Sequence, residues 1–138
     1  MTCRSWICAI AATVSVTAIA PLSAESVVTS RTIYLDFSMS EFTAEARDNL
    51  DDFLGEWRKS PALTIRITAH TDRVGSALAN QRLSLQRAAQ VKRYFVGKGV
   101  PAAKVIATGR GESEPALPTA DGVREPINRR VVIELVMP

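Results

Sequence analysis

The side chains best suited to chemistry lie in residues 69–88, which read AHTDRVGSALANQRLSLQRA. An alternating apolar and polar pattern before this stretch predicts a strand that ends at its first residue, so His70, Thr71 and Asp72 should emerge at the carboxyl edge of that strand. Arg87 follows fifteen residues after Asp72, on or beside the apolar face of an expected helix. Because unpaired charges are almost never buried, Arg87 needs an anion, and Asp72 is the nearest candidate in sequence.

A carboxylate and a guanidinium that lie side by side near a helix N-terminus can hold both ends of a zwitterion. Asp72 would accept hydrogen bonds from an ammonium group, and Arg87 would donate two parallel hydrogen bonds to a carboxylate. Backbone N–H groups at the start of the helix add attraction for an anion. The predicted ligand is an amino acid with free amino and carboxyl groups. The alternative is an internal ion pair that only stabilises the junction between loop and helix.

Other kinds of chemistry find little support in the sequence. His70 is the single histidine, and a general base needs a nucleophile and an orienting partner, neither of which a motif supplies. A metal site needs several ligands at defined spacing, and His70 beside Asp72 does not provide them. We therefore expect a structural His70 that is hydrogen-bonded to backbone, with no catalytic residue, no metal and no cofactor.

Two kinds of periodicity predict the elements that must position the candidate site. Alternating apolar and polar residues predict strands over residues 31–37, 63–69, 105–108 and 130–137. Apolar residues spaced by three and four predict one helix between the N-cap Thr43 and Pro61, and a second from about Asn80 to Lys98. Two strand–helix–strand units require crossovers, so we expect an α+β domain with two helices packed on one face of a mixed sheet.

The same patterns predict which side chains are buried and which segments are irregular. The expected core residues are Leu50, Phe53, Leu54 and Trp57 of the first helix, Leu83, Ala88, Val91, Tyr94 and Phe95 of the second, and Val131, Ile133 and Leu135 of the last strand. Residues 109–127 hold three glycines and three prolines, which predicts a long surface loop where the glycines serve turns. Residues 25–30 are expected to form a short polar lead-in.

The start of the chain has the pattern of a secretory signal peptide. Arg4 precedes an uncharged run from Trp6 to Ala20, and small residues lead to a predicted cleavage after Ala24. We therefore divide the 138 residues into a leader, residues 1–24, and one domain, residues 25–138. The alternative is a leader that is kept as a membrane anchor.

Charge and cysteine content exclude two further classes of protein. Removal of Arg4 with the leader leaves 16 Lys and Arg against 14 Asp and Glu, a balance that does not suit a nucleic-acid binder. Both cysteines, Cys3 and Cys8, lie in the leader, so the mature chain would have no thiol and no disulfide. Neither cysteine stands where a lipid attachment site requires one.

Five ordered pieces of the sequence resemble one known family. The pieces are YLDFSMSEF, AHTD, NQRLSLQRA, GRGESEP and NRRVVIEL, and together they cover nearly all of residues 31–136. They resemble the OmpA-like peptidoglycan-binding domain of outer-membrane proteins, Pal-type lipoproteins and MotB-type stator proteins. The resemblance implies a β-α-β-α-β-β fold that binds the meso-diaminopimelate of the peptidoglycan stem peptide without a covalent bond.

The resemblance also implies a set of binding residues. Its principal contacts fall on Asp72 and Arg87, and its pocket-lining positions fall on Asn80 and Arg129. Three further positions would contribute through backbone, and these are Phe37, Ser38 and Thr71. Ala69 departs from the family pattern, in which glycine is usual, and an alanine fits there unless the backbone needs a positive φ.

The implied role is to anchor or link the cell envelope from the periplasm, at the cell wall or the outer membrane face. Peptidoglycan is the expected partner, other envelope proteins are further partners, and membrane association is expected only if the leader is retained. The competing hypothesis is a periplasmic adaptor that uses the same fold to bind proteins and not the wall. An enzyme that hydrolyses the wall is a third and weaker alternative.

Overall fold

The computed structural model describes residues 26–34 and 42–138, which hold four strands, two α-helices and two 3-10 helices. In chain order the elements are β1 (Val27–Tyr34), α1 (Ala44–Lys59), β2 (Thr64–His70), α2 (Ala77–Gly97), η1 (Ala102–Lys104), β3 (Val105–Gly111), η2 (Pro126–Asn128) and β4 (Arg130–Val136). The predicted leader, residues 1–24, lies outside the described ranges, as do Phe37 and Ser38. None of the described helices is both long and apolar enough to cross a membrane.

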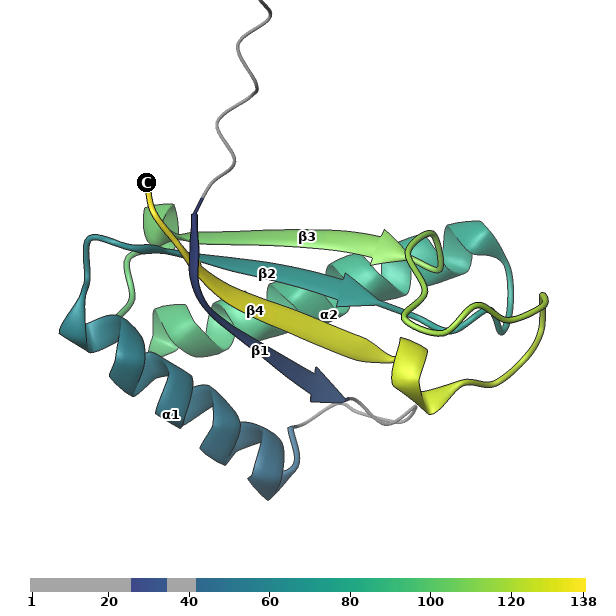
Figure 1. Ribbon diagram of the computed structural model, residues 1–138, viewed down its shortest axis with the longest axis horizontal. Helices are drawn as coiled ribbons and strands as arrows, with labels where there is room; N and C mark the ends of the chain where they lie inside the picture. The colour runs from purple at the N-terminus through teal and green to yellow at the C-terminus, as the bar shows by residue number, and fades with distance from the viewer. Residues whose placement is uncertain (1–25, 35–41) are drawn as a thin grey trace, which may run out of the picture.

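The four strands form one mixed sheet in the order β1-β4-β2-β3. β4 lies antiparallel to both β1 and β2, and β3 is parallel to β2. Figure 1 shows α2 crossing behind the strands and α1 beside β1. Alternate side chains of β2 and β4 join those of both helices in one hydrophobic core, which includes Ile67, Ile133, Phe53 and Phe95. The predicted α+β fold, with two helices on one face of a mixed sheet, is confirmed.

Helix α1 follows the sequence-based prediction closely. Thr43 is its N-cap, because the Thr43 side-chain oxygen accepts a hydrogen bond of 3.1 Å from the backbone N–H of Ala46. The predicted stripe of Leu50, Phe53, Leu54 and Trp57 is buried. The indole N–H of Trp57 donates to the carbonyl of Leu63 at 3.0 Å, which ties the end of the helix to the start of β2.

Three predicted boundaries were wrong. Helix α2 begins at Ala77, three residues before the predicted start, because Ser76 caps it by accepting a hydrogen bond from Ala79 N–H. Strand β1 begins at Val27, within the predicted lead-in, because its first residues pair with β4 although most of their side chains are exposed. Strand β3 continues to Gly111, beyond the predicted end at Thr108, since the ladder with β2 includes the glycines.

The carboxyl half of β3 packs against α2 at very short range. Gly109 was predicted to serve a turn, but it lies in the strand, where a Cβ would come within 2.5 Å of Leu85 N and Ser84 Oγ. The side chain of Gln81 donates to Gly109 O at 2.7 Å, and Gly111 N–H donates to Ser84 Oγ at 2.9 Å. These contacts fix the amino-terminal half of α2 against the end of the sheet where β2 also ends.

We predict that Gly109→Ala lowers the free energy of unfolding by about 1–3 kcal/mol, because the added methyl group must displace helix backbone. Urea denaturation monitored by circular dichroism measures the change. The matched control is Gly55→Ala in α1, where no heavy atom lies within 4 Å of the new Cβ. That substitution should raise stability by about 0.5–1 kcal/mol through helix propensity. A Gly109→Ala protein as stable as the wild type would contradict the close packing.

Candidate binding site

Asp72 stands directly beyond the carboxyl end of β2 and is 1% exposed. The hydrogen bonding between β2 and β3 continues to Thr71, whose N–H donates to Gly111 O at 2.9 Å. One carboxylate oxygen of Asp72 accepts from Val74 N–H at 3.3 Å, and the other accepts from Glu125 N–H at 3.4 Å. The Asp72 carboxylate therefore joins the end of β2 to the segment that leads into η2.

The direct ion-pair partner of Asp72 is Arg129. A guanidinium nitrogen of Arg129 lies 3.0 Å from the Oδ2 atom of Asp72, and both side chains are almost fully buried. Sequence reasoning had taken Asp72 as the anion that accompanies Arg87, and no direct ion pair joins those two side chains within the described ranges. Arg129 precedes β4, which is the neighbour of β2 in the sheet, so strand order brings together residues far apart in sequence.

Arg87 is a second buried cation at the same place. It lies on the inner face of α2, is 8% exposed, and has a buried Nη1 atom with no hydrogen-bond partner. Burial lowers the pKa of Arg87 most, the charge of Arg129 lowers it further, and the charge of Asp72 raises it. Together the three side chains of Asp72, Arg87 and Arg129 carry one net positive charge. Such a group, largely removed from water, is suited to an anion.

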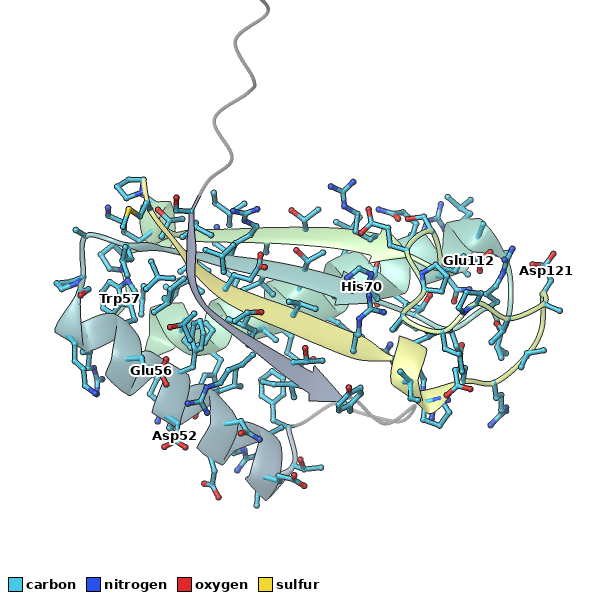
Figure 2. The ribbon with its side chains drawn as sticks, viewed as in Figure 1. Asp52, Glu56, Trp57, His70, Glu112 and Asp121 are labelled. Atoms are coloured by element: carbon cyan, nitrogen blue, oxygen red, sulfur yellow. The ribbon has the colours of Figure 1, made fainter. Side chains whose placement is uncertain are left out.

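Asn80 lies in the first turns of α2 and is also buried. Its side-chain amide donates a hydrogen bond of 2.6 Å to the carboxylate of Glu112, the residue that follows β3. Sequence reasoning missed Glu112, although the GRGESEP piece contains it. Figure 2 shows Glu112 at the end of the molecule where β2 and β3 end, with Asp121 further out on the loop before η2.

The loop between β3 and β4 is held in place by specific contacts. The side chain of Asn128 is fully buried and makes two hydrogen bonds of 2.8 Å with the backbone N–H and carbonyl of Leu117. Gly122 N–H donates to Arg73 O at 2.7 Å, and the side chains of Arg73 and Asp121 form an ion pair. These contacts position Arg129, which directly follows η2, and they give Asn128 a role that sequence reasoning did not assign.

The remaining predicted site residues have different outcomes. Thr71 is buried, and its side-chain oxygen has no hydrogen-bond partner. Phe37 and Ser38 belong to the part of the chain that the structure leaves undescribed. Ala69 fits its strand, because no non-glycine residue in the described ranges has a positive φ.

His70 does not join the site. The neighbouring Ala69 packs into the core under the helices, so His70 projects from the opposite face of the sheet. The predicted hydrogen bond to backbone is not found at Nδ1, which is buried without a partner. Burial lowers the pKa of His70 below its ordinary value of 6.5, and the charge of Arg130 lowers it further. Within the described ranges no group of three His, Cys, Asp or Glu side chains could hold a metal ion.

A mixed sheet with two helices on one face, and a buried group of two arginines and one aspartate at one end of the sheet, define a small α+β domain. The chain belongs to the OmpA family, which it matches over residues 34–129. It is 34% identical over 117 residues to outer membrane protein A of Bordetella avium, which covers 85% of this chain and 60% of that protein. The chain therefore spans under two thirds of this relative, and 24% of outer membrane porin F of Pseudomonas fluorescens.

Two solved structures have the same fold. The peptidoglycan-associated lipoprotein of Burkholderia pseudomallei superposes with a TM-score of 0.66 at 27% identity, over 77% of this chain and 88% of that one. The cell wall anchor of the T6SS of Pseudomonas aeruginosa superposes with a TM-score of 0.65 at 25% identity, over 79% of this chain and 81% of that one. The predicted OmpA-like fold is confirmed.

The excess positive charge predicts opposite effects on stability for two substitutions in the site. Asp72→Asn removes the carboxylate that pairs with Arg129 and lies near Arg87, and it should cost about 3 kcal/mol of the free energy of unfolding. Arg87→Met removes a buried cation whose Nη1 atom has no hydrogen-bond partner among the described residues, and it should raise stability by about 1 kcal/mol. Urea denaturation near neutral pH compares the variants. A large loss of stability in Arg87→Met would contradict the excess of charge.

The lowered pKa of His70 predicts that the free energy of unfolding depends on pH. Because the pKa of His70 is lowered by folding, the unfolded state binds more protons between pH 6.5 and the lower folded pKa. Stability should therefore fall as the pH is lowered from about 7 to about 5, above the range where most carboxylates titrate. His70→Gln should remove this fall. Parallel urea midpoints for the two proteins across that range test it, and an unchanged slope in His70→Gln would contradict it.

Proposed function

We propose that this chain binds peptidoglycan without a covalent bond, through the meso-diaminopimelate of the stem peptide, and that it is a binding domain and not an enzyme. The observation that carries the proposal is the buried guanidinium of Arg87, with an unpartnered Nη1 atom, next to the ion pair of Asp72 and Arg129. The net positive charge of this site suits a ligand carboxylate, and the carboxylate of Asp72 suits a ligand ammonium group.

The free end of the diaminopimelate side chain carries an ammonium group and a carboxylate on the same carbon atom. The ligand carboxylate would accept hydrogen bonds from Arg87, whose Nη1 has N–H groups that no described residue accepts from. The ligand ammonium group would donate to Asp72, whose two oxygens already accept from Arg129 and from backbone. Asn80 and Arg129 would line the pocket, and Thr71, Phe37 and Ser38 would add contacts mainly through backbone.

The affinity of one site should be modest. Charge-assisted hydrogen bonds contribute about 1.5–3 kcal/mol each, and desolvation and lost freedom of motion oppose that gain. A wall polymer presents many copies of the stem peptide, so avidity compensates where several domains are held together. Weak individual contacts of this kind suit a protein that anchors or links the envelope.

The names of two structural relatives support this role. One is a peptidoglycan-associated lipoprotein, and the other is a cell wall anchor. Several relatives that match in sequence are outer membrane proteins, such as outer membrane protein A and outer membrane protein P5. These names support our proposal that the chain acts in the periplasm at the wall or the outer membrane face, after export by residues 1–24 as a signal peptide.

We predict that Asp72→Asn and Arg87→Met each reduce binding to purified sacculi by tenfold or more, as expected for the loss of about 1.4 kcal/mol or more from the site. Co-sedimentation with diaminopimelate-containing sacculi measures the loss. Arg82→Met is the matched control, because Arg82 is an exposed arginine of the same helix. Arg87→Met is the sharper test, since its expected stability excludes unfolding as the cause. Binding by both site variants at the wild-type level would refute the assignment.

The chemistry of the wall separates the alternatives. Sacculi with lysine in place of diaminopimelate lack the second carboxylate and should not bind, and amidation of that carboxylate should weaken binding. Equal binding to lysine-type sacculi would refute the diaminopimelate contact. Absence of binding to every kind of sacculus would favour the protein adaptor, and release of soluble muropeptides would identify a hydrolase.

A further inference from the structure

The charges of the chain are strongly segregated. No acidic residue lies between Asp72 and Glu112, whereas eight of the 17 Lys and Arg residues fall in that span. The span contains all of α2 and β3, which pack against each other, and β3 is an edge strand of the sheet (Figure 1). Acidic side chains such as Asp48 and Asp52 lie on α1, beside the other edge strand. The surface formed by α2 and β3 is therefore mainly cationic; the Asp51 carboxylate of α1 pairs with Lys98 just beyond the end of α2.

An open groove runs along this cationic edge, at the carboxyl half of α2. It has a volume of about 760 Å³, and Lys92 and Arg93 supply its charged lining. The rest of its lining is small or apolar and consists of Ala89, Val96, Gly97, Ala102 and Ala107. Val96 is 38% exposed, and Ile106 of the adjoining strand is 49% exposed. None of the described residues that line the groove carries a carboxylate.

Within residues 26–34 and 42–138, β3 is the terminal strand of the sheet and pairs only with β2. A terminal strand presents backbone N–H and carbonyl groups that another strand can pair with. The side chains of Gln81 and Ser84 occupy the carboxyl half of β3, where they bind Gly109 O and Gly111 N–H. Ala107 lines the groove, so the amino-terminal half of β3 is the part that lies beside it.

We propose that this groove and the edge of β3 bind an acidic, extended segment of a partner protein, which adds a strand next to β3. Alternate side chains of an extended segment point to opposite faces, so one set of apolar side chains would enter the groove. The acidic side chains would meet Lys92 and Arg93. A second copy of this chain fits poorly, because pairing two β3 edges brings Lys92 and Arg93 of both copies together without an acid.

The groove is separate from the candidate binding site. Arg87 is on the buried face of α2, whereas the groove is formed by half-buried and exposed residues of the following turns, from Ala89 to Gly97. An occupant of the groove therefore leaves Asp72, Arg87 and Arg129 free to act. The domain can hold an acidic partner at one edge and a ligand at the end of the sheet at the same time.

A short synthetic peptide of alternating valine and glutamate is the test ligand, and the same peptide with lysine in place of glutamate is its control. Titrations followed by amide chemical shifts should show binding of the acidic peptide alone, with shifts in β3 and the second half of α2. Hydrogen exchange should show added protection of β3 amides. Equal binding of both peptides, or shifts confined to other elements, would overturn the proposal.

Charge reversals in α2 test the assignment to the groove. Lys92→Glu and Arg93→Glu should each weaken binding of the acidic peptide by about threefold to tenfold. Arg82→Glu makes the same change of charge roughly 15 Å along the helix from Lys92. This separation exceeds the screening length of about 8 Å at physiological salt, so that variant should bind as the wild type does.

One further variant and additional measurements complete the test. Ala89→Trp should fill the groove and abolish peptide binding, while all four variants should keep their binding to sacculi. Unchanged peptide binding in Lys92→Glu and Arg93→Glu, or an equal loss in Arg82→Glu, would overturn the proposal. So would self-association through β3 in light scattering, or binding to phosphatidylglycerol vesicles in place of the peptide.

Discussion

The ion pair between Asp72 and Arg129 is the contact on which the candidate site depends. It joins the end of β2 to the start of β4, and it draws the segment before η2 onto the sheet through Glu125 N–H. The carboxylate of Asp72 thereby holds together β2, the start of β4 and the loop before η2. The same contact leaves the Nη1 atom of Arg87 without a hydrogen-bond partner among the described residues, so Asp72, Arg87 and Arg129 together keep one positive charge. A ligand with a carboxylate completes the group.

Close packing between α2 and β3 offsets the unfavourable energy of burying this positive charge. Gly109 allows the backbone of α2 to approach β3, and Gln81 and Ser84 hold the two elements together through backbone groups. Because α2 is fixed at this end, Arg87 stays buried and does not extend into water. The hydrophobic core of α1 and the central strands supplies stability. The buried charges of Asp72, Arg87 and Arg129, at the end of the sheet, reduce it.

Sequence periodicity predicted the parts of the fold in which local pattern and burial agree. The stripe from Leu50 to Trp57 is an example, since every third or fourth residue is apolar and all of them are buried. The start of β1 at Val27 was not predictable in this way, because its pairing with β4 depends on backbone and most of its side chains are exposed. The pairing of Asp72 with Arg129 follows from strand order, a long-range property that spacing along the chain does not reveal.

The position of the first described residues has a mechanical consequence. Ser26 O accepts from Met137 N–H, and Val27 pairs with Val136, so β1 enters the sheet at the end opposite the one where Asp72 lies (Figure 1). In the alternative in which the leader is kept as a membrane anchor, a pull between that anchor and a ligand at Asp72 would run along the strands. The hydrogen bonds between β1 and β4 lie across that direction, so the load falls on them together, in shear. A tether in this place resists force far better than one that peels a strand away bond by bond.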